Sequence, residues 1–178
     1  MTERFKALYR EHIKRSGADR LLEWLETTDF FTAPASTRFH GAHPGGLCEH
    51  SLNVYHRLSG TVGETESVAI VALLHDICKA NFYKLTTRNV KNERTGQWEK
   101  VPYYTVEEQL PFGHGEKSVY LILRHMPLTE EEAVAIRYHM GNYTEEKGTS
   151  AAFEKYPLAL YLHQADEQAT YIDEKRGI

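Results

Sequence analysis

Cysteine and long apolar runs are scarce in this sequence of 178 residues. Its only two cysteines, Cys48 and Cys78, cannot build a disulfide framework and form no Cys-x-x-Cys pair, so we interpret both as buried apolar side chains in a reducing setting. The longest apolar run, residues 68–74, is far shorter than the ~20 residues of a membrane span. The first six residues lack the apolar segment of a signal peptide. Together these features predict a cytoplasmic protein with no membrane partner.

The sequence also lacks an excess of positive charge. A net charge of -4 argues against an extended grip on duplex nucleic acid. Internal repeats, a Walker A loop and a Gly-x-Ser-x-Gly elbow are all missing, which removes the usual signals of repeat proteins, P-loop enzymes and serine hydrolases. The remaining composition, 41% hydrophobic and 26% charged, is ordinary for a globular domain of this length.

Apolar residues recur at helical spacing along most of the chain. The pattern predicts helices over residues 3–15, 19–26, 46–60, 64–79, 115–124, 130–139 and 157–175. Gly60 and Gly63 are expected to break the third helix, and the fourth is apolar nearly all round, as a central buried helix would be. Thr129 and Glu132 fit a capping box. The expected fold is therefore an all-α bundle of six or seven helices.

Residues 82–106 interrupt the helical pattern. Two segments rich in aromatic and β-branched residues, 82–87 and 98–104, flank a turn signal at 92–96. This arrangement predicts an inserted β-hairpin that protrudes from the helical body. Its aromatic side chains could stack a base, or they could be ordinary strand packing or a surface for a homo-oligomer.

The ten histidines are the unusual component of the composition, and one of them stands next to an aspartate at the end of the apolar helix. Burying a carboxylate such as Asp76 beside the imidazole of His75 is costly unless something compensates, and a metal ion is the usual compensation. Imidazole and carboxylate together suit Fe, Mn, Co, Ni or Zn. The alternative is a histidine capped by the next turn of the chain.

Other histidines and one aspartate extend this pair into a pattern. Each would more often be a satisfied polar group if it stood alone. With the pair they give the order His, His-Asp, His, His, Asp across separate predicted helices. The additional residues are His50, His114, His139 and Asp166.

This order resembles that of the HD-domain superfamily of metal-dependent phosphohydrolases, over residues 40–169. The matching segments are PGGLCEHSL (44–52), LHDICK (74–79), FGHG (112–115), YHMG (138–141) and LHQAD (162–166). The first and last of these segments are most similar to the HD domain of bacterial 3′–5′ exoribonucleases, whose N-terminal OB-fold is absent from this sequence. The resemblance implies one HD domain over residues 1–178, with a helical extension and loop at 1–39, a core at 40–170 and the hairpin inserted at 82–106.

The resemblance also implies a metal site. His50, His75, Asp76 and Asp166 would form the minimal ligand set, with Asp76 able to bridge two ions. His114 and His139 stand where two-metal members of the family carry extra ligands. The implied cofactor is a divalent transition metal, two ions per chain, of Mn, Fe, Co or Ni, with Mg as a further option.

The family comparison assigns the reacting groups as well. Asp76 and Lys79 would be catalytic, with Lys79 on a substrate phosphate, although a lysine at a helix end also complements the helix dipole. Further phosphate-binding candidates are Arg38 and His40 in the preceding loop and Lys117 after His114; the alternative for the loop is simple solvation. His163, one turn before Asp166, is a candidate to orient that carboxylate. These candidates are all read from sequence position.

The implied activity is hydrolysis of a phosphate ester or anhydride in a nucleotide or short oligonucleotide, as a phosphomonoesterase, phosphodiesterase or nucleotidase. Two alternatives stay open. The same ligand order occurs in mixed-valent di-iron oxygenases of the superfamily, and a metal-stabilised nucleotide-binding module would need no catalysis.

Overall fold

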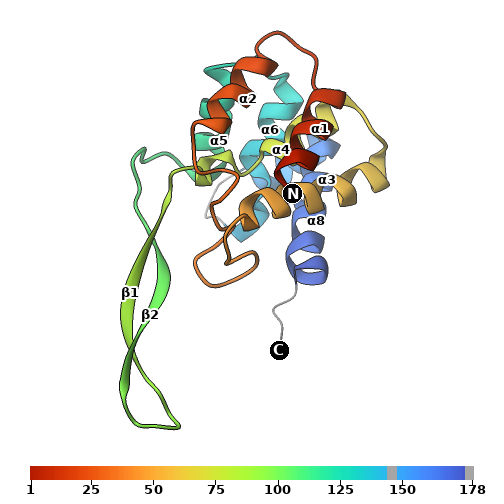
Figure 1. Cartoon of the computed structure of the whole chain (residues 1–178). Helices are drawn as coiled ribbons and strands as arrows, with labels where there is room; N and C mark the ends of the chain where they lie inside the picture. Colours follow the sequence, from red (N-terminus) through yellow and green to blue (C-terminus); the bar gives the residue numbers. More distant parts are fainter. Residues whose placement is uncertain (144–147, 175–178) are drawn as a thin grey trace.

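The computed structural model describes residues 1–143 and 148–174, and helices dominate them (Figure 1). The α-helices are α1 (Thr2–His12), α2 (Ala18–Glu26), α3 (Gly46–Val62), α4 (Glu66–Leu74), α5 (His114–Leu123), α6 (Glu130–Tyr138), α7 (Thr149–Lys155) and α8 (Pro157–Gln168). Three shorter turns are η1 (Ile77–Lys79), η2 (Gly141–Tyr143) and the π-helical η3 (Ala169–Asp173). The sheet consists of β1 (Tyr83–Lys91) and β2 (Trp98–Val106). The mostly helical fold is confirmed, with eight α-helices in the described residues rather than six or seven.

Helix α4 lies at the centre of the hydrophobic core. The side chain of its N-cap, Thr65, accepts a hydrogen bond from the Val68 N–H, and residues 68–74 are all buried. The helix packs against α1, α3, α6 and α8. A single helix over residues 64–79 was the wrong expectation, because α4 ends at Leu74. The His75 ring donates to the Ala72 carbonyl, which is the acceptor that a further helical turn would need.

Other helix boundaries also differ from the sequence pattern: α1 ends at His12 and not at residue 15, and the helix predicted from 157 is α8 only to Gln168, followed by η3. Helix α3 continues through Gly60 and ends at Val62, with Gly63 as its C-cap, whose φ of 88° is a left-handed value that suits glycine. A helical glycine costs only about 1 kcal/mol relative to alanine, and Gly60 did not break the helix. Helix α7 has no counterpart in the prediction, since its seven residues give no clear apolar stripe.

The loop between α2 and α3, residues 27–45, is folded back on itself. Its Ala35 N–H donates to the Gly41 carbonyl (2.9 Å), and the Ser36 hydroxyl donates to the His40 carbonyl (2.7 Å). A Cβ on Gly46 would lie 2.0 Å from the Gly41 oxygen, so only glycine allows the loop to approach the start of α3 this closely. These contacts fix the position of His40.

The β-hairpin extends away from the helical body (Figure 1, lower left). Its antiparallel register runs from Tyr83 opposite Val106 to Lys91 opposite Trp98, as the sequence predicted in outline. At its root, the Tyr83 hydroxyl donates to the Ala35 carbonyl (3.2 Å). In the described ranges, no helix combines the length and the apolar content that a membrane crossing requires.

Candidate metal centre

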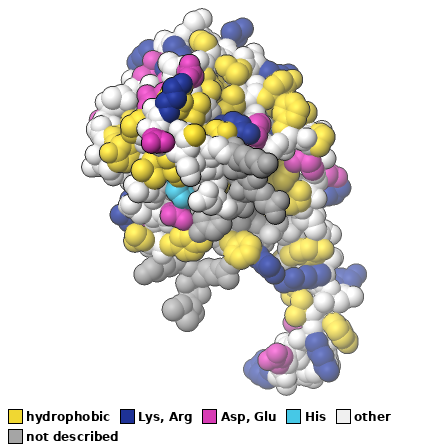
Figure 2. All heavy atoms as spheres, turned by 180° about the vertical axis from the view of Figure 1, so that it is seen from behind, with side chains coloured by type: hydrophobic (Ala, Val, Ile, Leu, Met, Phe, Trp, Pro, Cys, Tyr) yellow, Lys and Arg dark blue, Asp and Glu magenta, His cyan; other side chains and the backbone are white. Residues whose placement is uncertain are grey.

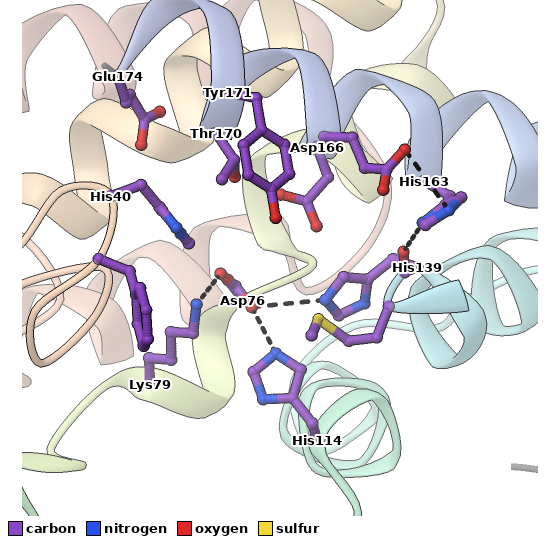
Figure 3. A pocket seen from close by; sticks show the side chains of 13 residues that line it. His40, Asp76, Lys79, His114, His139, His163, Asp166, Thr170, Tyr171 and Glu174 are labelled. Carbon is purple, nitrogen blue, oxygen red and sulfur yellow. Dashed lines mark hydrogen bonds and ion pairs between the residues drawn. The ribbon is translucent and has the colours of Figure 1, made fainter. Parts of the chain in front are cut away.

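The six predicted metal ligands converge at one end of α4. They come from five separate parts of the chain, and each lies on a helix or at a helix end. The residues are His50 on α3, His75 and Asp76 after α4, His114 at the start of α5, His139 after α6, and Asp166 on α8. Four of these six, namely Asp76, His114, His139 and Asp166, line a cavity of about 640 Å³ (Figure 3). His50 and His75 are fully buried and are not part of its lining.

Asp76 is the centre of the cluster and is only 2% exposed. Its Oδ1 accepts a hydrogen bond from His114 Nε2 (2.7 Å), and its Oδ2 accepts one from Lys79 Nζ (2.6 Å). Burial alone would raise the pKa of Asp76, but the charge of Lys79 and the hydrogen bond from His114 outweigh it and hold this pKa well below its usual range. Asp76 is therefore an ionised carboxylate facing several imidazoles.

The rings of His75 and His139 are oriented by the same kind of hydrogen bond. Each ring donates from Nδ1 to the carbonyl three residues earlier, Ala72 (2.9 Å) and Ile136 (2.6 Å) respectively. A carbonyl only accepts, so the ring proton lies on Nδ1 and the lone pair of Nε2 points into the cluster. Burial lowers the pKa of His75 to about 3, which keeps it in the neutral form that binds metals.

The other ring nitrogen of His139 has an unusual environment. Its Nε2 is buried and has no hydrogen-bond partner in the part of the chain that is described; Asp76 Oδ1 is 3.6 Å away. Leaving a buried nitrogen unpaired costs free energy, and a cation at this position would satisfy it. The orphaned atom therefore fits a metal site better than simple packing.

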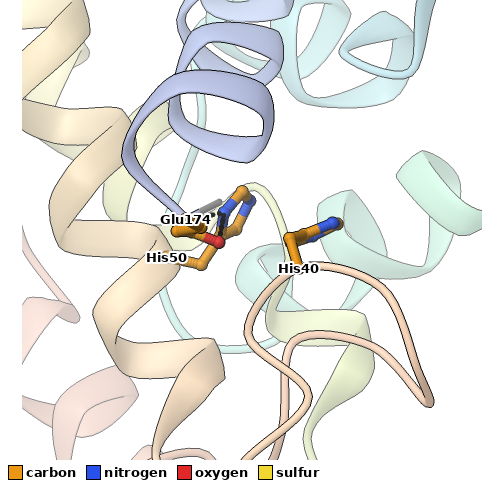
Figure 4. Close-up of side chains that lie close together, drawn as sticks. All are labelled: His40, His50 and Glu174. Atoms are coloured by element: carbon orange, nitrogen blue, oxygen red, sulfur yellow. Dashed lines mark hydrogen bonds and ion pairs between the residues drawn. The ribbon is translucent and has the colours of Figure 1, made fainter. Parts of the chain in front are cut away.

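His50 is held between two carboxylates, one of which sequence reasoning missed. Its Nε2 lies 3.1 Å from Asp166 Oδ1, and its Nδ1 lies 3.0 Å from Glu174 Oε1 (Figure 4). Asn53 Nδ2 donates to the same Glu174 oxygen at 2.9 Å. Burial opposes the charge on His50, but the hydrogen bonds to Asp166 and Glu174 outweigh it and raise the pKa of His50 to about 10.

The donor atoms can hold cations. Four groups of three potential ligands have their donor atoms within 4.8 Å of one another, close to the separation of about 4.4 Å that two ligands on opposite sides of one ion can reach. Asp76 belongs to two of these groups, one with His50 and His75 and the other with His114 and His139. A mixture of imidazole nitrogen and carboxylate oxygen suits Mn, Fe, Co, Ni or Zn.

Two predicted substrate-binding residues face the cavity. Lys79 is 12% exposed at its side chain, and although burial would lower its pKa, Asp76 raises it above the ordinary value and keeps the ammonium charged. Burial lowers the pKa of His40 to about 4, so this ring is neutral near pH 7. His40 Nε2 is buried without a hydrogen-bond partner among the described residues, and Figure 3 shows the ring directed toward the cavity.

The structure does not bring the other two candidates to the cavity. Arg38 is exposed and lies over the ring of Phe39 (5.1 Å to the centroid). Lys117 is buried, pairs with Glu108 (2.6 Å) and lies 4.8 Å from the ring centroid of Phe82. Neither lines the space that Lys79 and His40 face, so their role in substrate binding stays a prediction without support from this geometry.

His163 lines the cavity, and its Nδ1 donates to the carbonyl of His139 (2.8 Å). This contact holds the ring against the segment after α6, and the expected role of orienting Asp166 stays a prediction. Thr170, Tyr171 and Glu174 also line the cavity, and no motif marked them in the sequence. They lie in or directly after η3, which continues α8.

Comparison with known proteins found no relative. No protein-family model matches the sequence, no curated protein matches it, and no solved structure matches the fold. What this site does is therefore inferred from its own residues.

Proposed function

We propose that this protein is a metal-dependent phosphohydrolase of the HD-domain type. Its substrate would be a phosphate ester or anhydride of a nucleotide or short oligonucleotide. The observation that supports this function is the convergence of four histidines and two aspartates, from separate parts of the chain, next to a cavity that also presents Lys79. A structural cluster would not need an orphaned imidazole nitrogen or a charged lysine on the same side.

Two cations would be held by two groups of residues that share Asp76. One group is Asp76 with His114 and His139, and the other is Asp76 with His50 and His75. Asp166 would add a further carboxylate, since it groups with His75 and His139 and its Oδ1 lies 3.1 Å from His50 Nε2. When bound, such a pair of divalent cations lowers the pKa of a water and neutralises charge on the phosphate. The protein's contribution is to fix these side chains in a buried site, which the carbonyl contacts of His75 and His139 achieve.

The chain's own polar groups would position the substrate. Lys79 carries a positive charge at the cavity wall and is suited to a phosphate oxygen. The neutral His40 ring offers a second polar contact across the cavity. A volume of about 640 Å³ lies within the usual range for small-molecule sites, so a mononucleotide or the end of an oligonucleotide fits.

The attacking group in this proposal is water. Within the described residues, no serine or cysteine lines the cavity, and the Cys78 thiol is instead 3.3 Å from His114 Nδ1. Hydrolysis without an amino-acid nucleophile is what a site built from metal ligands supports.

The test is a product assay on the purified protein loaded with Mn²⁺ or Fe²⁺. The substrates are nucleoside mono-, di- and triphosphates, cyclic dinucleotides and short oligonucleotides, and metal content is measured by mass spectrometry. We expect Asp76→Asn to lose metal and to reduce kcat/KM by about 100-fold or more, because a cation supplies several kcal/mol of charge stabilisation. Asp19→Asn removes an exposed carboxylate on α2 and should leave both measurements unchanged.

Two outcomes would overturn the proposal. Oxygen consumption by the iron-loaded protein, without phosphate release, would indicate an oxygenase. Stoichiometric metal with no turnover of any phosphorylated compound would indicate a metal-stabilised binding module.

A further inference from the structure

Within the described ranges, the β1–β2 hairpin, residues 83–106 and here called the arm, packs mainly against itself. Each strand has nine residues, so the arm reaches ~30 Å. None of its residues is buried, and the most exposed large side chain is that of Trp98, at 70%. An isolated two-stranded sheet is marginally stable in water, and large apolar side chains at its tip are costly to expose. The arm therefore has the properties of a binding surface.

The arm differs from the rest of the chain in charge. It holds five basic side chains and two acidic ones, a formal charge of +3, whereas the rest of the chain accounts for -7 of the total of -4. The basic residues are Lys84, Arg88, Lys91, Arg94 and Lys100, and the acidic ones are Glu93 and Glu99. Figure 2 shows Lys and Arg side chains along the projecting arm, at lower right. A positive arm on a negative protein favours an anionic ligand.

The register places an aromatic ring among these charges. Trp98 lies directly opposite Lys91, and Lys100, two residues along β2, projects on the same face. On the other face, Arg88 lies 5.3 Å from the ring centroid of Tyr103. Aromatic rings interleaved with Lys and Arg are the chemistry that single-stranded nucleic acid requires, since bases stack on the rings and phosphates meet the cations.

The arm begins next to the proposed catalytic cavity. Strand β1 starts four residues after Lys79. The Tyr83 hydroxyl holds the root of the arm to the carbonyl of Ala35, in the loop whose Phe39 and His40 line the cavity. A strand bound along the arm would therefore have one end near Lys79.

We propose that the arm binds single-stranded nucleic acid and delivers its end to the cavity, which makes oligonucleotides the substrate class. This inference rests on the proposed function for its choice of ligand. A second copy of the chain is the competing occupant, because the arm is positive and the rest of the chain is negative. The exposed Trp98 between two lysines favours nucleic acid, since it adds a stacking platform to the charge.

The experiment is fluorescence anisotropy with labelled single strands of about 12 nucleotides, DNA and RNA, in EDTA at about 50 mM and 200 mM salt. We expect the unmodified protein to bind, and Trp98→Ala to weaken binding by about 5-fold or more at both salt concentrations, which corresponds to one lost stacking contact. Lys100→Glu should weaken binding by a similar factor at 50 mM and by less at 200 mM salt.

Matched controls come from α5 and its C-cap, Arg124. Tyr120→Ala removes another exposed aromatic ring (43% exposed), and Arg124→Glu makes the same charge reversal at an exposed site outside the arm. Neither should change the affinity by more than about 2-fold. Equal affinity of the arm variants and these controls would overturn the inference.

Two further results would also overturn it. The first is no binding by the unmodified protein. The second is a dimer in sedimentation experiments that Lys100→Glu dissociates, which would assign the arm to a second copy. Because EDTA removes metal and turnover, the outcome is separate from the proposed function: hydrolysis of mononucleotides without oligonucleotide binding would refute this inference alone, whereas binding without hydrolysis would refute the proposed function alone.

Discussion

Helix α4 and strand β1 are both nine residues long and nearly adjacent in the sequence, but their environments are opposite. In α4 seven consecutive side chains are buried, and the next two residues, His75 and Asp76, lie at the candidate metal centre. In β1 no side chain is buried. Metal ligands must be fixed to a fraction of an ångström, whereas a polymer ligand needs side chains that solvent can reach. Under the two proposals above, neighbouring segments of the chain would serve these two requirements.

The largest expected effect is on stability. Leu73→Ala in α4 removes a fully buried side chain and should lower the free energy of unfolding by about 2–5 kcal/mol. Leu85→Ala in β1 removes a side chain that is 62% exposed and should change it by less than about 0.5 kcal/mol. Urea denaturation measures both. Comparable losses would mean that the arm is buried in solution, against a partner or a second copy.

The second prediction concerns metal addition. A divalent cation at about 100 times its Kd should stabilise the folded protein by roughly 2.7 kcal/mol, because it binds the native site and not the unfolded chain. Hydrogen exchange should slow around His75 and His139 while the arm stays unchanged. Asp76→Asn should abolish the effect. If the cation slowed hydrogen exchange in residues 83–106 as much as it does around His75 and His139, the arm and the candidate metal centre would not be independent of each other.

A third effect is expected at Glu174. Glu174→Gln keeps the shape of the side chain that contacts His50 but removes its charge, and should weaken metal binding by about 10- to 100-fold. Competition titration with a chelating dye measures this affinity without any substrate. Asp173→Asn is the control, since that carboxylate pairs with Arg57. Unchanged affinity in Glu174→Gln would show that Glu174 only packs against His50.

The smallest expected effect is on the pH dependence of stability, at Glu132, which lies outside both α4 and the arm. Burial would raise the pKa of Glu132, but hydrogen bonds from Arg15, Ser67 and Thr129 outweigh it and lower this pKa below its usual value. Stability from this carboxylate is therefore full above pH ~4.3, the value for the unfolded chain, and is lost as pH falls through the folded-state pKa. As the pH falls from 6 to about 3, the melting temperature of Glu132→Gln should decrease less than that of the unmodified protein. Glu93→Gln in the arm should match the unmodified protein.

Most of the candidate centre could be predicted from sequence because its ligands stand at recognisable places. His75 and Asp76 follow a run of apolar residues, and His114 lies between two glycines. The prediction failed where tertiary contacts decide. Glu174 reaches His50 only because α8 continues into η3, and Gly60 stays inside α3, where the cost of one glycine is small against the packing of the whole helix. Neither effect leaves a local pattern in the sequence.

The histidines after α4 and α6 have a consequence for how such a centre can arise. Each imidazole donates a hydrogen bond to a carbonyl that its own helix leaves unpaired. Every helix end has such carbonyls, so the backbone of the helix end orients the ring. No partner residue has to appear elsewhere in the chain at the same time. A single substitution to histidine at the buried end of a helix can therefore supply an aimed ligand, and a multi-ligand centre can be assembled one helix at a time.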